Sequence, residues 1–176
     1  MLLSRDELIT TLFRETDRAQ RLKTGLAVIL CGIDGWESYE SRLERPALLE
    51  AELEIAKRIA RALRCYDSLG RFGRGQYCVI LPGCNSFYAV AMAQRLRQDA
   101  FSSTVFASGE ELKIQAFFGI AGSGGRSPVV VLRNAEDALR AARERGAGSI
   151  ERSSYDAEPD PLSCPVLAVE DSPLYR

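Results

Sequence analysis

The order of apolar and polar residues predicts helices that alternate with short strands. Apolar residues recur at helical spacing over residues 5–22, and Ser4 and Glu7 before them form the pattern of a capping box. Residues 26–31 are continuously apolar, which is typical of a short strand covered on both faces. Gly32 to Trp36 then reads as a turn.

The same alternation continues to about residue 152. Further helices are predicted over residues 46–64, 86–100 and 135–145, and further strands over residues 67–72, 77–81, 103–107, 112–121 and 148–152. In the helix after Pro46, helical spacing places Leu49, Leu53 and Ile59 on the buried face. Helices alternating with strands around one tight hairpin favour an α/β sandwich, a sheet with helices packed on its faces.

Composition narrows the class of protein. A chain of 176 residues is about one domain, and its net charge of −1 gives no electrostatic reason to bind nucleic acid or an anionic membrane. There is no signal peptide and no apolar run of transmembrane length, so we expect a cytoplasmic protein without membrane insertion. The five cysteines lack paired spacing and are expected as free thiols. The absence of histidine removes histidine-dependent catalytic triads and most zinc sites.

The hairpin turn at residues 73–77 is the most informative segment. Strand-like residues lie on both sides of it, and Gly73 and Gly75 are expected to supply the positive φ angles of a tight turn. This segment resembles the signature of the GGDEF domain, the diguanylate cyclase fold, which reads Gly-Gly-Asp/Glu-Glu-Phe. Gly73 matches the first glycine and Arg74 replaces the second. Gly75 replaces the metal-binding acid, Gln76 the glutamate and Tyr77 the phenylalanine.

The resemblance covers roughly residues 4–152. It includes residues 26–36, which align with a strand ending in Asp-x-Asp-x-Phe, residues 81–84 after the signature, and the helix before Gly146. The fold that it implies is a central, mostly antiparallel five-stranded sheet with helices on its faces, related to nucleotidyl cyclase and polymerase palm domains. The activity that it implies is cyclisation of GTP with magnesium, which prefers carboxylate oxygens.

The residues that the family uses for this chemistry are largely replaced. Gly32 occupies the position of one of the family's metal ligands and Gly75 the position of the other. We therefore expect no metal site, no cofactor and no cyclase activity. Asp34 remains and is interpreted as a turn-capping residue. Glu40 stands where the family reads guanine with asparagine, and Arg143 matches a lysine that contacts phosphate.

A second constellation of the family is retained. Arg64 and Asp67 form the Arg-x-x-Asp pattern of the inhibitory site that binds cyclic di-GMP, and Arg95 matches a further arginine of that site. An arginine fork bonds the O6 and N7 edge of guanine, and a carboxylate accepts from guanine N–H groups. The alternative is a surface ion pair at a helix end beside a solvated helix face. Arg74 is interpreted as an exposed turn residue rather than a phosphate ligand.

The C-terminal part differs in composition. Residues 153–164 form a linker that is rich in proline and acidic residues. Residues 165–176 resemble the first strand and acidic pair of a response-regulator receiver domain, which would make the chain a fragment of a longer protein. The alternative is an apolar tail that ends in charges by chance.

Three functions therefore compete. The favoured one is an inactive GGDEF signalling domain, residues 1–152, that binds cyclic di-GMP at Arg64, Asp67 and Arg95 and regulates an attached or partner domain in bacterial two-component signalling. The second is a ligand-free regulatory or dimerisation module whose partner is the receiver-like domain, another signalling protein or a second copy. The third is an active cyclase with replaced ligands.

Overall fold

The computed structural model describes residues 2–156 of the chain. The helices are α1 (Arg5–Leu22), α2 (Trp36–Arg42), α3 (Arg45–Ala62), α4 (Ser86–Asp99) and α5 (Pro128–Arg145). The strands are β1 (Leu2–Leu3), β2 (Leu26–Ile33), β3 (Ser68–Gly73), β4 (Gln76–Pro82), β5 (Val105–Ala107), β6 (Glu110–Leu112), β7 (Ala116–Gly122) and β8 (Ile150–Arg152). Helices are interspersed with strands along the chain, and α2 and β1 are additional elements that the sequence pattern did not predict.

The central sheet is mixed but mostly antiparallel. Its strand order is β1-β3-β4-β2-β7-β8, and β5 and β6 form a separate two-stranded sheet. Strands β3, β4, β2 and β7 are joined by antiparallel pairings, whereas the edge strands β1 and β8 pair in parallel with β3 and β7. The predicted α/β sandwich is therefore confirmed, with one very short edge strand more than the five that were expected.

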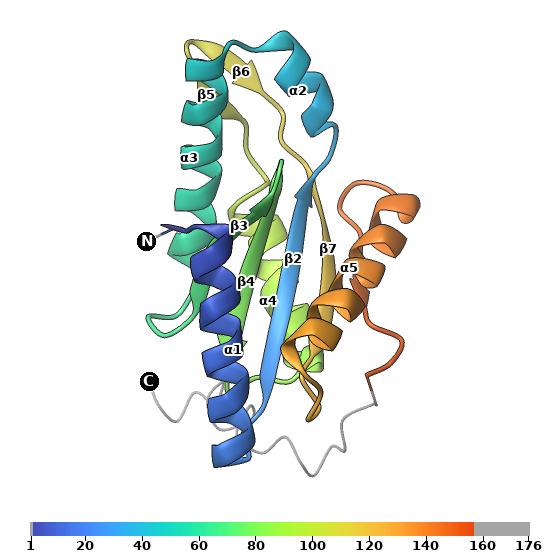
Figure 1. Ribbon diagram of the computed structural model, residues 1–176. Coiled ribbons are helices and arrows are strands. Elements are labelled where there is room, and N and C mark those ends of the chain that lie inside the picture. The colour runs from blue at the N-terminus through green and yellow to red at the C-terminus, as the bar shows by residue number, and fades with distance from the viewer. Residues whose placement is uncertain (1, 157–176) are drawn as a thin grey trace, which may run out of the picture.

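Helices cover both faces of this sheet (Figure 1). Helices α1 and α5 lie on one face and α3 and α4 on the other. Every residue of β2 is buried, because alternate side chains of this strand point into the two helix-covered cores. Ile29 and Cys31 belong to the core under α3 and α4, whereas Val28 and Leu30 belong to the core under α1 and α5.

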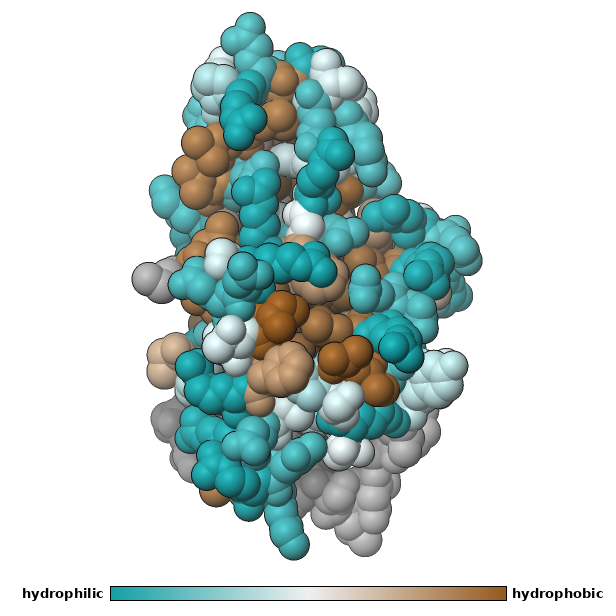
Figure 2. All heavy atoms as spheres, in the orientation of Figure 1, coloured by the Kyte–Doolittle hydropathy of each residue, from teal (hydrophilic) through white to brown (hydrophobic). Residues whose placement is uncertain are grey.

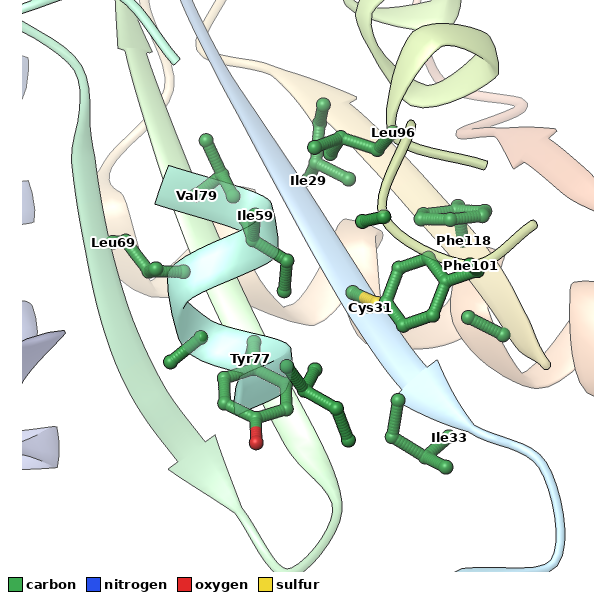
Figure 3. Close-up of a cluster of buried hydrophobic side chains, with 14 of the residues drawn as sticks. Ile29, Cys31, Ile33, Ile59, Leu69, Tyr77, Val79, Leu96, Phe101 and Phe118 are labelled. Atoms are coloured by element: carbon green, nitrogen blue, oxygen red, sulfur yellow. The ribbon is translucent and has the colours of Figure 1, made fainter. Parts of the chain in front are cut away.

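The core under α3 and α4 is large and extends to the hairpin. Figure 3 shows Ile59 of α3 and Leu96 of α4 over side chains from the central strands, with Tyr77 at the hairpin end of the cluster. Phe101 and Phe118 meet edge to face, with ring centroids 6.0 Å apart. This packing fixes the position of β4, which carries the second half of the signature turn.

Several predicted boundaries were wrong. The segment Gly32 to Trp36 is not all turn, since β2 continues to Ile33 and α2 begins at Trp36. The last helix begins at Pro128 and not at residue 135, because Ser127 caps it by accepting a hydrogen bond from the Val130 N–H. The predicted strand 112–121 is the end of β6 followed, after a break, by β7.

The buried face of α3 was also assigned in part to the wrong residues. Ile59 is buried as predicted, but Leu49 and Leu53 are 55% and 51% exposed, and smaller side chains such as Ala51 and Ile55 face the sheet instead. Figure 2 shows the resulting apolar surface over α3 at the upper left of the molecule. Two leucines four residues apart thus form an apolar stripe on the solvent side of α3.

Two further properties concern the whole described region. No helix within residues 2–156 is long and apolar enough to cross a membrane. No disulfide joins the four cysteines that the structure describes, of which Cys31 and Cys78 are fully buried, and burial raises the pKa of both thiols. Of the linker predicted over residues 153–164, residues 153–156 are described and pack on the domain, since Ser153 is buried and Asp156 pairs with Arg126 at 3.0 Å. Cys164, the rest of the linker and the receiver-like segment lie outside the described residues.

Candidate functional site

The signature hairpin lies at the C-terminal end of β2. Arg74 and Gly75 form the two-residue turn between β3 and β4, and Gly73 pairs with Gln76 across it. The Ile33 N–H donates to the Gly75 carbonyl at 2.9 Å, which ties the end of β2 to the turn. Only Gly75 has a positive φ, +63°, so the expectation that Gly73 also requires one was wrong.

Gly75 is also the point of closest approach to an aromatic side chain. A Cβ atom at this position would lie 2.6 Å from the Trp36 Cβ and even closer to the indole ring. Trp36 begins α2 and is only 3% exposed. The indole therefore occupies the space into which an acidic side chain at position 75 would extend.

The second expected metal position is closed in a similar way. A Cβ atom on Gly32 would lie 2.6 Å from the Phe117 ring, and Gly32 and Phe117 are paired on adjacent strands. The guanidinium of Arg143, from α5, lies 5.0 Å from the centroid of that ring. Arg143 also lines a small cavity of about 150 Å³ together with Gln76. The residue matched to a phosphate-contacting lysine is thus beside the signature, stacked on an aromatic ring.

Arg74, in the hairpin turn, forms an ion pair with Glu40 of α2. Its Nε and Nη2 atoms donate to the two Glu40 carboxylate oxygens at 3.0 and 2.7 Å. The hydrogen bonds from Arg74 lower the pKa of the Glu40 carboxyl, and its positive charge acts in the same direction. Arg74 is an exposed turn residue as predicted, and its partner is the residue that stands at the guanine-reading position. Sequence reasoning did not foresee this pair.

Tyr77 is the signature residue whose side chain lies in the core, and a hydrogen bond to α3 holds it in place. It is 2% exposed, and its hydroxyl donates to the Glu52 carbonyl at 3.1 Å. Burial is the main cause that raises the pKa of the Tyr77 phenol, and the nearby Glu52 carboxylate adds to it. This bond anchors the hairpin to α3.

The residues present do not fit a magnesium ion. The two positions that the resemblance matches to the family's metal ligands are Gly32 and Gly75, which have no side chain to act as a ligand. No group of three or more histidine, cysteine, aspartate or glutamate side chains in residues 2–156 is arranged to hold a metal. Asp34 lies exposed in the turn before α2.

Arg64 and Asp67 form a compact, partly buried ion pair after α3. The Arg64 backbone N–H donates to Asp67 Oδ2 at 2.8 Å, and its Nη2 donates to Asp67 Oδ1 at 2.8 Å. The same Nη2 also donates to the Pro82 carbonyl at 3.2 Å and to Cys84 Sγ at 3.0 Å. The Asp67 side chain is fully buried, whereas that of Arg64 is 22% exposed. The ion pair at a helix end that the alternative interpretation expected is therefore present, but it is partly buried rather than on the surface.

Two tyrosines complete the surroundings of Arg64. The guanidinium lies 4.5 Å from the centroid of the Tyr66 ring and 6.0 Å from that of Tyr88. Partial burial acts to lower the pKa of Arg64, but the hydrogen bonds and charges of Asp67 and Cys84 outweigh it and raise the pKa. Arg64 consequently carries a permanent positive charge between aromatic rings.

Arg95 lies apart from this pair. It follows Tyr88 by seven residues on α4, which places it on the same helix face about 10 Å further along the axis. Its side chain is 60% exposed and pairs with Asp99 at 3.5 Å. Among the described residues, no hydrogen bond or ion pair joins Arg95 to Arg64 or Asp67. The structure thus brings Arg64 and Asp67 into contact but not Arg95.

The packing of Gly75 against Trp36 predicts a specific cost of adding a methyl group. Gly75→Ala introduces both a strained positive φ and an overlap with the indole, whereas Gly83→Ala introduces only the strain, because Gly83 has φ +76° and open space around it. We expect Gly75→Ala to lower the free energy of unfolding by about 1–3 kcal/mol more than Gly83→Ala does. Urea denaturation measures both, and the difference should vanish in a Trp36→Ala background. Equal costs would contradict the overlap.

The burial of Asp67 predicts that it stabilises the free protein. Asp67→Ala leaves the partly buried Arg64 charge without its carboxylate, so we expect the free energy of unfolding to fall by about 3 kcal/mol. Asp99→Ala is the matched control, because it also removes the partner of an arginine but at an exposed site, and should cost at most about 1 kcal/mol. Chemical denaturation of both variants tests this, and similar losses would show that the Asp67 pair has no special structural role.

Comparison with known proteins agrees with this fold. The family model described as the diguanylate cyclase GGDEF domain matches residues 1–149. The GGDEF domain of YfiN (TpbB) from Pseudomonas aeruginosa is 24% identical, with a TM-score of 0.81 over 88% of this chain and 98% of that one. The active GGEEF domain of a Vibrio cholerae diguanylate cyclase is 20% identical, with a TM-score of 0.79 over 89% and 100%.

A third similar structure contains a ligand. The GGDEF domain of DgcB from Caulobacter crescentus, in complex with c-di-GMP, is 18% identical, with a TM-score of 0.80 over 87% of this chain and 89% of that one. These likenesses concern the fold, and the family model covers most of the chain. This chain belongs to the GGDEF domain family.

Proposed function

We propose that this protein is a catalytically inactive GGDEF signalling domain that binds cyclic di-GMP and regulates an attached or partner domain. The observation that carries the first part is the packing of aromatic rings onto the two glycines at the metal positions. Phe117 lies over Gly32 and Trp36 over Gly75, so the missing carboxylates are replaced by apolar contacts rather than by other metal ligands. A triphosphate brought to this hairpin would lack the cation that neutralises it.

The guanine-reading position supports the same proposal. Glu40 makes a bidentate ion pair with Arg74, and both residues are held by the turn and by α2. A guanine base entering here would have to replace this pair. The charges of Arg74 and Glu40 beside the hairpin thus already neutralise each other.

The binding of cyclic di-GMP is proposed at Arg64 and Arg95. In the described region, Nε and Nη2 of Arg64 make the bonds to Asp67, Pro82 and Cys84, whereas Nη1 makes none. Because the Asp67 carboxylate is buried under Arg64, its main contribution is to orient the guanidinium; direct contact with guanine N–H groups, as the family pattern implies, requires the pair to open. DgcB, a structure of the same fold, contains c-di-GMP.

A second candidate function is a ligand-free regulatory or dimerisation module. The observation that favours it is the apolar stripe of Leu49 and Leu53 on the outer side of α3, together with Phe106, which is 61% exposed. A receiver-like domain, another signalling protein or a second copy would be the partner. The receiver-like assignment of residues 165–176 and a cytoplasmic location remain predictions.

The first prediction from this proposal is catalytic silence. The purified protein should form no cyclic di-GMP from GTP with Mg²⁺ or Mn²⁺, because positions 32 and 75 supply no ligands. The double variant Gly32→Asp, Gly75→Glu should also be silent and should lose about 2 kcal/mol or more of unfolding free energy through overlap with Phe117 and Trp36. Product is measured by chromatography against an active GGDEF domain and a no-protein blank. Product clearly above the blank would support the active cyclase instead.

The second prediction concerns binding. Arg95→Ala should weaken cyclic di-GMP binding more than tenfold in calorimetric titration, since a charged contact contributes about 2 kcal/mol. Arg64→Ala should do the same, but Arg95 is the cleaner test because its side chain is exposed. Arg21→Ala is the matched control, an exposed helical arginine that likewise pairs with an aspartate four residues away.

The titration also separates the two candidate functions. If the parent protein gives no heat and no thermal shift with cyclic di-GMP at high micromolar concentration, the binding proposal fails. The ligand-free module then becomes the better account. The exposed leucines of α3 are then the surface at which a partner is expected to bind.

A further inference from the structure

A cavity of about 330 Å³ lies between α1 and the loop that carries the Arg-x-x-Asp pattern. Arg14, Glu15 and Arg18 line it from α1, and Tyr66 and Pro82 line it from the other side. Cavities of a few hundred Å³ are of the size that holds small ligands. It is distinct from the signature hairpin and lies beside the Arg64 region, because Tyr66 is in contact with Arg64 and Pro82 accepts a hydrogen bond from it.

One of the residues that line this cavity is an acid, Glu15. The Glu15 side chain is only 12% exposed. Among the described residues its carboxylate has ion-pair contacts to Arg14 and Arg18 at 3.8 and 3.9 Å, both too long for hydrogen bonds. A carboxylate has two acceptor oxygens, and those of Glu15 are not among the fully buried side-chain atoms, so a ligand can reach them. Glu15 is thus an acceptor that a ligand with adjacent N–H donors would satisfy.

Cationic and aromatic groups surround that acceptor. The guanidiniums of Arg14 and Arg18 are 68% and 62% exposed and lie on one face of α1, four residues apart. Tyr66 is 54% exposed and also lines the cavity. Thr24 and Ser68 are further polar residues of the cavity lining.

We propose that this cavity is a binding site for a guanosine phosphate unit. The N1–H and N2–H groups of guanine lie side by side and match the two oxygens of Glu15, whereas adenine presents an acceptor at N1 and is disfavoured. Tyr66 supplies a surface on which the base stacks, since stacking on aromatic side chains accepts any base and leaves the choice to Glu15. Arg14 and Arg18 bind the phosphate.

Two sources offer this chemistry, a guanine mononucleotide and one half of cyclic di-GMP. The second source would extend the site proposed at Arg64 and rests on that proposed function, whereas the first is independent of it. The residues that distinguish the cavity are Glu15, Arg14 and Arg18, none of which belongs to the Arg-x-x-Asp pattern.

The test is calorimetric titration of the whole chain with GMP, AMP, guanosine and cyclic di-GMP, without divalent metal. We expect the parent protein to bind GMP at least tenfold more tightly than AMP and than guanosine. Glu15→Gln should weaken GMP binding at least tenfold, because an amide replaces one acceptor oxygen by a donor. Arg18→Ala should bring the affinity for GMP close to that for guanosine. Asp17→Asn, a change on the same helix at a 69% exposed side chain, should bind GMP like the parent.

The outcomes separate this inference from the proposed function. If Glu15→Gln weakens cyclic di-GMP together with GMP, the ligand is one half of the dinucleotide; if it weakens GMP alone, the ligand is the mononucleotide. GMP binding that requires Glu15 upholds the cavity even when cyclic di-GMP fails to bind. Equal affinities for GMP and AMP, no heat with GMP at millimolar concentration, or an unchanged Glu15→Gln variant would overturn the inference, and Arg95→Ala would still report on the other site.

Discussion

The two-sided pairing and burial of β2 is the constraint on which the other features depend. This strand is hydrogen-bonded to β4 on one edge and to β7 on the other, and all eight of its residues are buried. Both edges and both faces are therefore filled by protein. The residues at the end of β2 must therefore fit between strands and helices whose positions the sheet fixes.

At that end, aromatic side chains pack against two glycines. A metal site at Gly32 and Gly75 would place carboxylates close together, and such a cluster is stable only when a cation neutralises it. Here aromatic rings from α2 and β7 lie against the two glycines instead, and Tyr77 secures the hairpin to the Glu52 backbone. These contacts bury apolar surface and need no ligand, so the hairpin is complete in the free protein.

In the Arg64 region, by contrast, charged groups rather than apolar contacts occupy the site. There a charge is retained in a partly buried place, and it is stabilised by Asp67, by a backbone carbonyl and by the ring of Tyr66. Holding the guanidinium in one orientation reduces the entropy lost when a ligand binds it. The same loop forms one wall of the cavity beside α1, so the Arg64 charge and this cavity are adjacent.

The sequence by itself determined the features that depend on neighbours along the chain. The capping box at Ser4 and Glu7 and the bounds of α1 came out as predicted, since a cap joins residues three apart. The buried character of β2 and the place of the hairpin turn were also evident, because uninterrupted apolar runs and glycine-rich turns are local signals. The family resemblance added a single central, mostly antiparallel sheet, which the local pattern does not specify.

Only the tertiary structure decided how distant residues meet. Leu49 and Leu53 fit a helical stripe as well as Ala51 and Ile55 do, and the smaller set faces the sheet because α3 packs closely there. The pairing of Arg74 with Glu40 and the packing of Trp36 on Gly75 join residues more than thirty positions apart. Such contacts depend on how the strands are registered and the helices placed, and no spacing in the sequence specifies them.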